Sequence, residues 1–365
     1  MKGANSHGQL GQGLDSPEEV PLPQEIENPI AYDIDLSQLT KIVGGAGHTL
    51  ILDSSGHLFE CGRHQQLNSP NLPASSRFRR FRSGLEGVRL VDIACGWDSS
   101  ILLSETGQVF GLGSNTHGQL GSLRSVTKES AALIEGLPPI CKLAMGLRHS
   151  AVITRDSKLF VSGDGTKGQL GVKIEAGVRS LHDFVLVPDL DDVSEVSCGQ
   201  HHTVAITKNN RVFAWGDNKH GQLGIDPKLH PRVSTPVEVR INADALDSVH
   251  CGWTHTTILT SGGKLLTWGR NSYGQLGRVT SKADSWKPEL LEISVPVEQL
   301  SVGSEHSVAL CTNRSILSWG WNEHGNCGIG SKEDVLRPTN VALPENSGIL
   351  IGTGAGHSFA VIKTN

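Results

Sequence analysis

Histidine is the residue type in this chain that most readily suggests chemistry, because imidazole ligates metals and titrates near neutral pH. The chain has 16 histidines. Six of them end a Gly-x-x-His motif and are called the framework histidines here: His48, His149, His202, His255, His306 and His357. Regular spacing around a repeat fold keeps such copies too far apart to share a metal. We therefore predict structural histidines that hydrogen-bond backbone within their own repeat unit, and neither a metal site nor a cofactor.

Other chemical motifs are missing from the sequence. It contains no GxxxxGK[ST] phosphate loop, no strand–GxGxxG–helix unit, no nucleophile elbow and no HExxH. A net charge of −5 argues against binding to nucleic acid, and no apolar run approaches the roughly 18–20 residues of a membrane span. Seven cysteines without a CxxC pair indicate a reducing compartment. We expect a monomeric protein of the cytoplasm, with the nucleus as a second location, and no catalytic residues of its own.

The Gly-x-x-His motif marks an internal repeat. Its glycines, including a seventh copy at Gly96 with Ser99 in the histidine position, lie 50 to 53 residues apart. A second glycine, found in Trp-Gly and its variants, follows 17 residues after the first in six units. The repeat units begin near residues 42, 93, 143, 196, 249, 300 and 351. We therefore predict one repeat domain over residues 1–365.

Each unit has the pattern of a small antiparallel sheet. In the unit around Gly252, two β-branched or apolar runs, 256–260 and 264–269, flank the turn Ser261-Gly262-Gly263. Residues 249–251 predict a strand before this hairpin, and residues 236–239 an outer strand. Four short strands per fifty residues are typical of a propeller blade. The predicted fold is an all-β, seven-bladed β-propeller of four-stranded antiparallel blades.

The two residues between glycine and histidine differ from unit to unit, although the blade itself requires no particular side chain there. By symmetry, all these loops open at one end of the propeller. They carry residue types that are enriched in protein-binding surfaces or able to pair with charge. We predict that five of them are solvent-accessible and bind a partner: Trp97, Asp98, Arg148, Trp253 and Glu305. The alternative is that the tryptophans pack between blades and the charges are merely solvated.

At Gly-x-x-His, Trp-Gly-x-Asn and Gly-Gln-Leu-Gly the sequence resembles the regulator-of-chromosome-condensation repeat family over essentially its whole length. Gly252-Trp253-Thr254-His255 and Trp319-Gly320-Trp321-Asn322 are most similar to its secretion-regulating exchange factors. The resemblance implies that acidic residues in the Gly-x-acid positions, Asp98 and Glu305, contact a small GTPase.

Two functions follow as hypotheses. The first is a guanine nucleotide exchange factor or regulator of a small GTPase, with exocyst or other secretory proteins as further partners. The second is a non-catalytic interaction scaffold in membrane traffic without exchange activity. The interval from each second glycine to the next first glycine is only 33 to 36 residues, which leaves no room for the extra β-wedge that the resemblance associates with exchange.

The last repeat unit predicts how the ring closes. Counting from His357 puts the hairpin turn of this unit at Asn365, so its next strand must come from residues ahead of Gly3. Lys2 then occupies the position that Trp215 has in another unit. We expect both termini in one incomplete blade with one strand mostly missing, as in a chain with an alternative start or an incomplete gene model.

Overall fold

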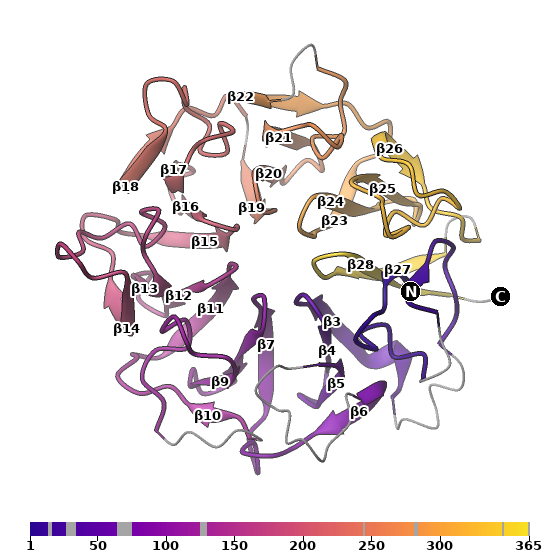
Figure 1. Ribbon diagram of the computed structural model, residues 1–365, viewed down its shortest axis with the longest axis horizontal. Coiled ribbons are helices and arrows are strands. Elements are labelled where there is room, and N and C mark those ends of the chain that lie inside the picture. Colours follow the sequence, from indigo (N-terminus) through magenta and orange to yellow (C-terminus); the bar gives the residue numbers. More distant parts are fainter. Residues whose placement is uncertain are drawn as a thin grey trace.

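The computed structural model describes residues 1–13, 17–26, 34–63, 75–124, 130–243, 245–280, 284–344 and 347–363. These residues form seven four-stranded sheets arranged as blades around a central axis (Figure 1). The predicted seven-bladed β-propeller is therefore confirmed. Among the described residues the only helical element is the 3-10 helix η2 (Leu36–Gln38), and no helix there is long and apolar enough to cross a membrane.

Strand order from the axis outwards is the same in every blade. The innermost strands are β3 (Leu39–Gly44), β7 (Leu90–Cys95), β11 (Ile140–Met145), β15 (Val193–Cys198), β19 (Leu246–Cys251), β23 (Val297–Val302) and β27 (Gly348–Thr353). The second strands are β4 (His48–Asp53), β8 (Ser99–Ser104), β12 (His149–Thr154), β16 (His202–Thr207), β20 (His255–Thr260), β24 (His306–Cys311) and β28 (His357–Ile362). The third strands are β5 (Leu58–Gly62), β9 (Val109–Gly113), β13 (Leu159–Asp164), β17 (Val212–Asp217), β21 (Leu265–Arg270), β25 (Ile316–Gly320) and β1 (Lys2–Ala4). The outer strands are β6 (Ser75–Phe81), β10 (Ala132–Leu133), β14 (Ser180–Leu186), β18 (Arg232–Val239), β22 (Asp284–Leu291), β26 (Val335–Asn340) and β2 (Glu19–Val20).

The hydrophobic core lies between neighbouring blades. All six residues of β16 are buried, because this strand has another blade against each of its faces. Trp215 of β17 is fully buried and packs in one cluster with Val161 of β13 in the preceding blade. Burying a large apolar side chain contributes roughly 1.5–3 kcal/mol, so each cluster ties two blades together.

Cross-strand pairing explains the constant interval of 17 residues. His202 of β16 lies directly opposite Gly216 of β17. Gly216 has a φ of 111°, and a Cβ on it would lie 2.3 Å from the carbonyl oxygen of His201. Only glycine fits this close approach without strain.

The three sequence motifs meet at the junction between blades. The carbonyl oxygen of Gln169, in a Gly-Gln-Leu-Gly turn, accepts hydrogen bonds from Trp215 Nε1 at 2.9 Å and Thr203 Oγ1 at 2.8 Å in the next blade. His149 Nε2 lies 2.9 Å from the same Thr203 hydroxyl. The prediction that these histidines hydrogen-bond backbone of their own unit was wrong, because the imidazole contacts a hydroxyl group of the next blade instead. Four other framework histidines make the same contact, in the pairs His48–Ser100, His202–Thr256, His306–Ser358 and His357–Thr49.

Both chain ends lie in one blade, as predicted. Its strand order is β2-β1-β28-β27, and Figure 1 shows the N-terminus beside β27 and β28. Lys2 pairs with Ser358 as Trp215 pairs with Thr203, and its Nζ donates to the carbonyl oxygen of Cys327 at 2.6 Å. Burial lowers the pKa of Lys2 to about 8. The strand β1 has three residues where β17 has six.

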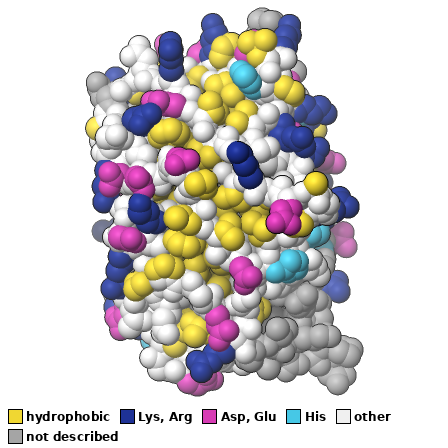
Figure 2. All heavy atoms as spheres, turned by 90° about the vertical axis from the view of Figure 1, so that its left-hand side faces the viewer, with side chains coloured by type: hydrophobic (Ala, Val, Ile, Leu, Met, Phe, Trp, Pro, Cys, Tyr) yellow, Lys and Arg dark blue, Asp and Glu magenta, His cyan; other side chains and the backbone are white. Residues whose placement is uncertain are grey.

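The rim of the propeller is formed by the outer edge strands. Figure 2 shows the side that carries β14 and β18, where a band of hydrophobic side chains is interspersed with charged ones. Leu186 of β14 is 47 % exposed. Charges distributed along such edges discourage pairing with a further strand.

Candidate partner-binding face

The Gly-x-x-His loops and the equivalent loop of Gly96 lie around the axis at one end of the propeller, which we call the loop face. Backbone hydrogen bonds connect one loop to the next: Trp253 N donates to Ser304 O at 2.7 Å, and Ala46 N donates to Trp97 O at 3.0 Å. Similar bonds connect four other pairs of loops: 147–199, 200–253, 304–355 and 355–45. The loop side chains are therefore presented by rigid backbone, which lowers the entropy lost when a partner binds.

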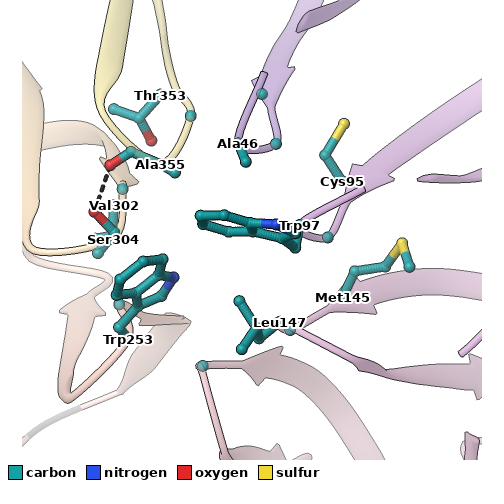
Figure 3. A pocket seen from close by; sticks show the side chains of 18 of the residues that line it. Ala46, Cys95, Trp97, Met145, Leu147, Trp253, Val302, Ser304, Thr353 and Ala355 are labelled. Atoms are coloured by element: carbon teal, nitrogen blue, oxygen red, sulfur yellow. Dashed lines mark hydrogen bonds between the residues drawn. The ribbon is translucent and has the colours of Figure 1, made fainter. Parts of the chain in front are cut away.

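Two tryptophans meet at the axis. The rings of Trp97 and Trp253 face one another with their centroids 5.5 Å apart and their planes at 44° (Figure 3). Leu147 lies beside them, and the axial pocket that these loops line has a volume of about 90 Å³. Trp97 is 37 % exposed and Trp253 is half-buried. The alternative of tryptophans packed between blades therefore does not hold for this pair.

A larger cavity of about 450 Å³ opens beside the tryptophan pair, and we call it the aromatic basin. Asp98, Trp97 and Trp253 all line it. Asp98 is half-buried. The other charged or aromatic residues that line the aromatic basin are His7, Arg63, Arg270, Tyr273, Glu305, Trp321, Glu323 and His324. Arg270 stacks on the Tyr273 ring at 4.7 Å, and Trp321 contacts His324 edge-on at 5.1 Å. Aromatic rings beside both signs of charge are typical of a protein-binding surface.

Glu305 corrects one of the predictions: it is not solvent-accessible. Its side chain is only 7 % exposed. Its carboxylate accepts hydrogen bonds from Thr254 Oγ1 at 2.7 Å and from Gln275 Nε2 at 2.6 Å. The guanidinium of Arg270 lies 3.9 Å away. The carboxylate is therefore held inward by its own neighbours.

A substitution in the neighbouring blade explains the burial of Glu305. In two other blades the turn glutamine donates to an aspartate of its own third strand, Gln169 to Asp164 and Gln222 to Asp217, each at 3.0 Å. The corresponding residue beside Gln275 is Arg270. Arginine cannot accept a hydrogen bond, so Gln275 donates to Glu305 of the next blade instead.

The other predicted residues are placed as follows. Arg148 is exposed on its loop but does not line the aromatic basin. The framework histidines are fully buried. Burial lowers the pKa of His149, His202, His306 and His357 to about 3 and that of His48 to about 4, so the rings are neutral. No group of three or more potential metal-ligating side chains occurs among the described residues.

Several residues of the basin lie outside the predicted set, because the prediction rests only on the positions between glycine and histidine. Arg63, Arg270 and Trp321 each follow the second repeat glycine directly. Tyr273 and His324 lie in the turn before Gly-Gln-Leu-Gly or its variant. The residues at both of these positions also vary between units, so the same variation could have identified them from the sequence.

The architecture is that of a regulatory propeller protein, in which the repeats form the scaffold and the loop face varies between blades. Comparisons with known proteins agree with this class. A family model described as RCC1-like domain matches residues 1–360. The chain is 34 % identical over 401 aligned positions to the secretion-regulating guanine nucleotide exchange factor of Mus musculus, covering 99 % of this chain and 82 % of that protein. The Bos taurus protein of the same name is also 34 % identical, with the same coverage. The chain therefore belongs to the RCC1-like domain family.

A solved structure extends the comparison. Prp20p of Saccharomyces cerevisiae, described with its binding properties to Gsp1p and histones, superimposes with a TM-score of 0.87 at 25 % identity. The match covers 100 % of this chain and 91 % of Prp20p. Human WBSCR16 superimposes with a TM-score of 0.83 at 20 % identity, covering 98 % of that chain, which shows the shared fold.

Proposed function

We propose that this protein regulates a small GTPase, as a guanine nucleotide exchange factor, through the aromatic basin of its loop face. The observation that carries the proposal is the tryptophan pair at the axis, which is partly exposed and flanked by the half-buried Asp98. Support comes from the relatives named as secretion-regulating guanine nucleotide exchange factors and from Prp20p with its binding to Gsp1p.

The chemistry of the basin suits a partner that presents both apolar and basic groups. Trp97 and Trp253 offer a rigid apolar surface, and truncation of such anchors typically costs 2 kcal/mol or more of binding free energy. Asp98 and the exposed Glu323 attract basic side chains. A regulator that binds the nucleotide-free GTPase most tightly weakens nucleotide binding by the same factor, which accelerates GDP release.

The test is GDP release from a panel of small GTPases loaded with fluorescent GDP. The double variant Asp98→Lys/Glu323→Lys reverses the charge of the basin, whereas Glu292→Lys reverses an exposed charge ahead of β23, at the other end of the propeller. We expect acceleration by the parent and by Glu292→Lys, and a loss of at least about tenfold with the double variant. Equal acceleration by all three proteins would place the GTPase elsewhere on the molecule. A charge reversal at Glu305 would not separate binding from folding, because reversing a buried carboxylate destabilises the protein as well.

A scaffold without exchange activity is the second candidate. The observation that favours it is that every blade has four strands and no additional hairpin within the described part of the chain. Saturable binding of a GTPase without any change in GDP release would support the scaffold. The link to secretion, including an exocyst or other secretory partner, rests on the relatives' names. We also propose a reducing compartment, cytoplasm or nucleus, because all seven cysteines are free thiols.

A further inference from the structure

Arg148 is the one predicted partner-binding residue that does not line the aromatic basin. It is exposed on the loop face. Its carbonyl oxygen accepts a hydrogen bond from Asp164 N at 2.9 Å. This bond joins the loop of Arg148 to the turn of residues 164–168, which follows β13 in the same blade.

Three further cations adjoin this turn. Lys167 lies within it and is exposed. Nη1 of the exposed Arg232 donates to the carbonyl oxygen of Thr166 at 3.3 Å. The carbonyl oxygen of the exposed Arg179 accepts a hydrogen bond from Gly165 N at 2.8 Å. We call Arg148, Lys167, Arg179 and Arg232 the basic cluster.

The described residues provide no ion-pair partner for the basic cluster. Asp164, the carboxylate of the turn, is buried, and its Oδ2 accepts hydrogen bonds from Thr166 Oγ1 and Gln169 Nε2, each at 3.0 Å. In the next blade, by contrast, Arg211 pairs with Glu238 at 2.6 Å. The four cations of the basic cluster therefore keep their charge available for a ligand.

The ring of His201, on the loop of the next blade, shows that two of these cations lie near one another. Burial lowers the pKa of the half-buried His201, whereas the carboxylates of Asp164 and Asp217 raise it. The nearby charges of Lys167 and Arg148 lower it as well. Both cations are therefore close to the same ring, and one ligand can contact both.

The basic cluster extends from the axis of the propeller towards its rim. Arg148 follows Leu147, which lines the axial pocket. Arg179 directly precedes the outer strand β14, and Arg232 is the first residue of the outer strand β18. Neighbouring strands lie about 4.8 Å apart, so the four strands of a blade span roughly 14 Å. An extended peptide covers about 3.3 Å per residue, and about five residues would therefore follow the basic cluster from end to end.

The charges around the basic cluster favour an acidic protein segment over a longer polyanion. The whole chain has a net charge of −5, which repels nucleic acid and anionic membranes at long range. Asp98 and the exposed Glu323 lie on the same face. A polyanion spread over the face would meet these carboxylates, whereas a short segment would contact only the cations.

We propose that the basic cluster binds an extended acidic segment of a partner protein, about five residues long and rich in Asp and Glu. The guanidinium groups of Arg148, Arg179 and Arg232 can each bind a carboxylate through two hydrogen bonds, and Lys167 supplies a point charge. The site is separate from the aromatic basin and does not depend on the exchange function proposed for it.

The test uses the 365-residue protein and a fluorescent, doubly capped peptide, Asp-Glu-Asp-Glu-Asp. The control peptide, Asn-Gln-Asn-Gln-Asn, has the same length and shape without the charge. We expect saturable binding of the acidic peptide by fluorescence anisotropy at about 0.05 M salt, at least about fivefold weaker binding at about 0.3 M salt, and no binding of the control. Failure of the acidic peptide to bind, or equal binding of both peptides, would overturn the proposal.

Two double variants of equal net charge locate the bound peptide. Arg148→Glu/Lys167→Glu reverses two charges of the basic cluster, whereas Arg240→Glu/Lys264→Glu reverses two exposed charges at the other end of the propeller. We expect the first to weaken the peptide at least about tenfold and the second to leave its affinity within about twofold. Equal weakening by both would show attraction to the net charge alone and would refute the site. Should the first variant lower Tm, Arg148→Gln/Lys167→Gln removes the charge without repulsion and should still weaken the peptide at least about threefold.

Cross-linking gives an independent position for the peptide. A carbodiimide joins a peptide carboxylate to a lysine amine only where the two are in contact. We expect mass spectrometry to find the acidic peptide on Lys167 and not on the equally exposed Lys264. Similar yields on both lysines would contradict binding at the basic cluster.

The same titration with other anions decides the class of partner. The probes are a thymidine oligonucleotide with five phosphates and vesicles that contain phosphatidylserine. We expect both to bind more weakly than the acidic peptide. Tighter binding of either probe that is lost in Arg148→Glu/Lys167→Glu would assign the basic cluster to phosphate groups and overturn its assignment to a protein segment.

Discussion

Mild acid should destabilise this propeller more than most proteins, because its interior holds neutral imidazoles. Burial lowers the pKa of His149, His202, His306 and His357 to about 3, and that of His48 and of His250 on β19 to about 4. The unfolded chain has the ordinary histidine pKa of about 6.5. Below that pH the unfolded state binds protons that the folded state does not. Stability is therefore complete above about pH 6.5 and falls continuously as the pH decreases towards 4.

The size of the effect follows from linkage. At pH 5.5 an unfolded histidine is about nine-tenths protonated, so each of the six loses roughly 1 kcal/mol of stability between pH 7.5 and 5.5. Six together lose roughly 6–8 kcal/mol, which is comparable to the whole free energy of unfolding of an ordinary domain, about 5–15 kcal/mol. We therefore expect acid unfolding to begin near pH 5.5, well above the range in which carboxylates protonate.

The assay is urea denaturation at half-unit pH steps from 7.5 to 5.5, with the slope of stability against pH giving the protons bound on unfolding. The variant His149→Asn removes one buried imidazole and should reduce that uptake by about one proton at pH 5.5. Replacing the exposed His7 by Asn is the matched control for removing one histidine from the surface. A flat profile in the parent, or an equal slope in His149→Asn, would show that the buried rings are protonated in the fold and would refute the reasoning.

Three further predictions concern a repeat glycine, the buried Glu305 and the framework histidines. Gly216→Ala should lower the free energy of unfolding by more than the roughly 1–3 kcal/mol that a strained backbone costs, because its Cβ also meets a carbonyl oxygen. Gly177 has a similar φ but open space around it, so Gly177→Ala shows the backbone effect without the clash in the same denaturation assay. Glu305→Lys should lose roughly 3–5 kcal/mol of stability but Glu305→Gln only about 1, and equal effects in calorimetry would contradict its buried role. Added zinc or a chelator should leave Tm unchanged, whereas a shift of several degrees would show that the histidines bind metal.

The fold was predictable because the same residues solve the same local problem seven times. The glycine at position 216 and the histidine at 202 are fixed by one cross-strand contact, so the interval between them cannot vary. The closure of the ring was predictable for the same reason, since the N-terminal residues, with Gly3 opposite His357, had to supply the next strand of the last blade. The hydroxyl partners of five framework histidines were not predictable, because each belongs to the next blade, 52 to 54 residues along the chain or, for His357, at its other end.

The composition of the binding face was predictable only in part. The variable positions between glycine and histidine predicted Trp97 and Trp253. Their contact across the axis could not be predicted, because it depends on how loops of non-adjacent blades converge. Arg270 and Trp321 come from a different strand of the blade, so no single position in the repeat marks the basin.

Glu305 shows how a variable position of the loop face can be drawn into the interior. Asp98 and Glu305 occupy the same place in the repeat, yet Asp98 is half-buried and Glu305 is enclosed. The enclosure of Glu305 originates in the preceding blade, where Arg270 stands in place of the aspartate that accepts a hydrogen bond from the turn glutamine in two other blades, and Gln275 donates to Glu305. Burying an amide without an acceptor costs about 1–3 kcal/mol, so the nearest carboxylate is drawn inward to satisfy it. The hydrogen-bond requirement of Gln275 therefore withdraws Glu305 from the surface of the loop face, so the framework partners of a variable residue, as well as its position in the repeat, determine whether its side chain faces outward.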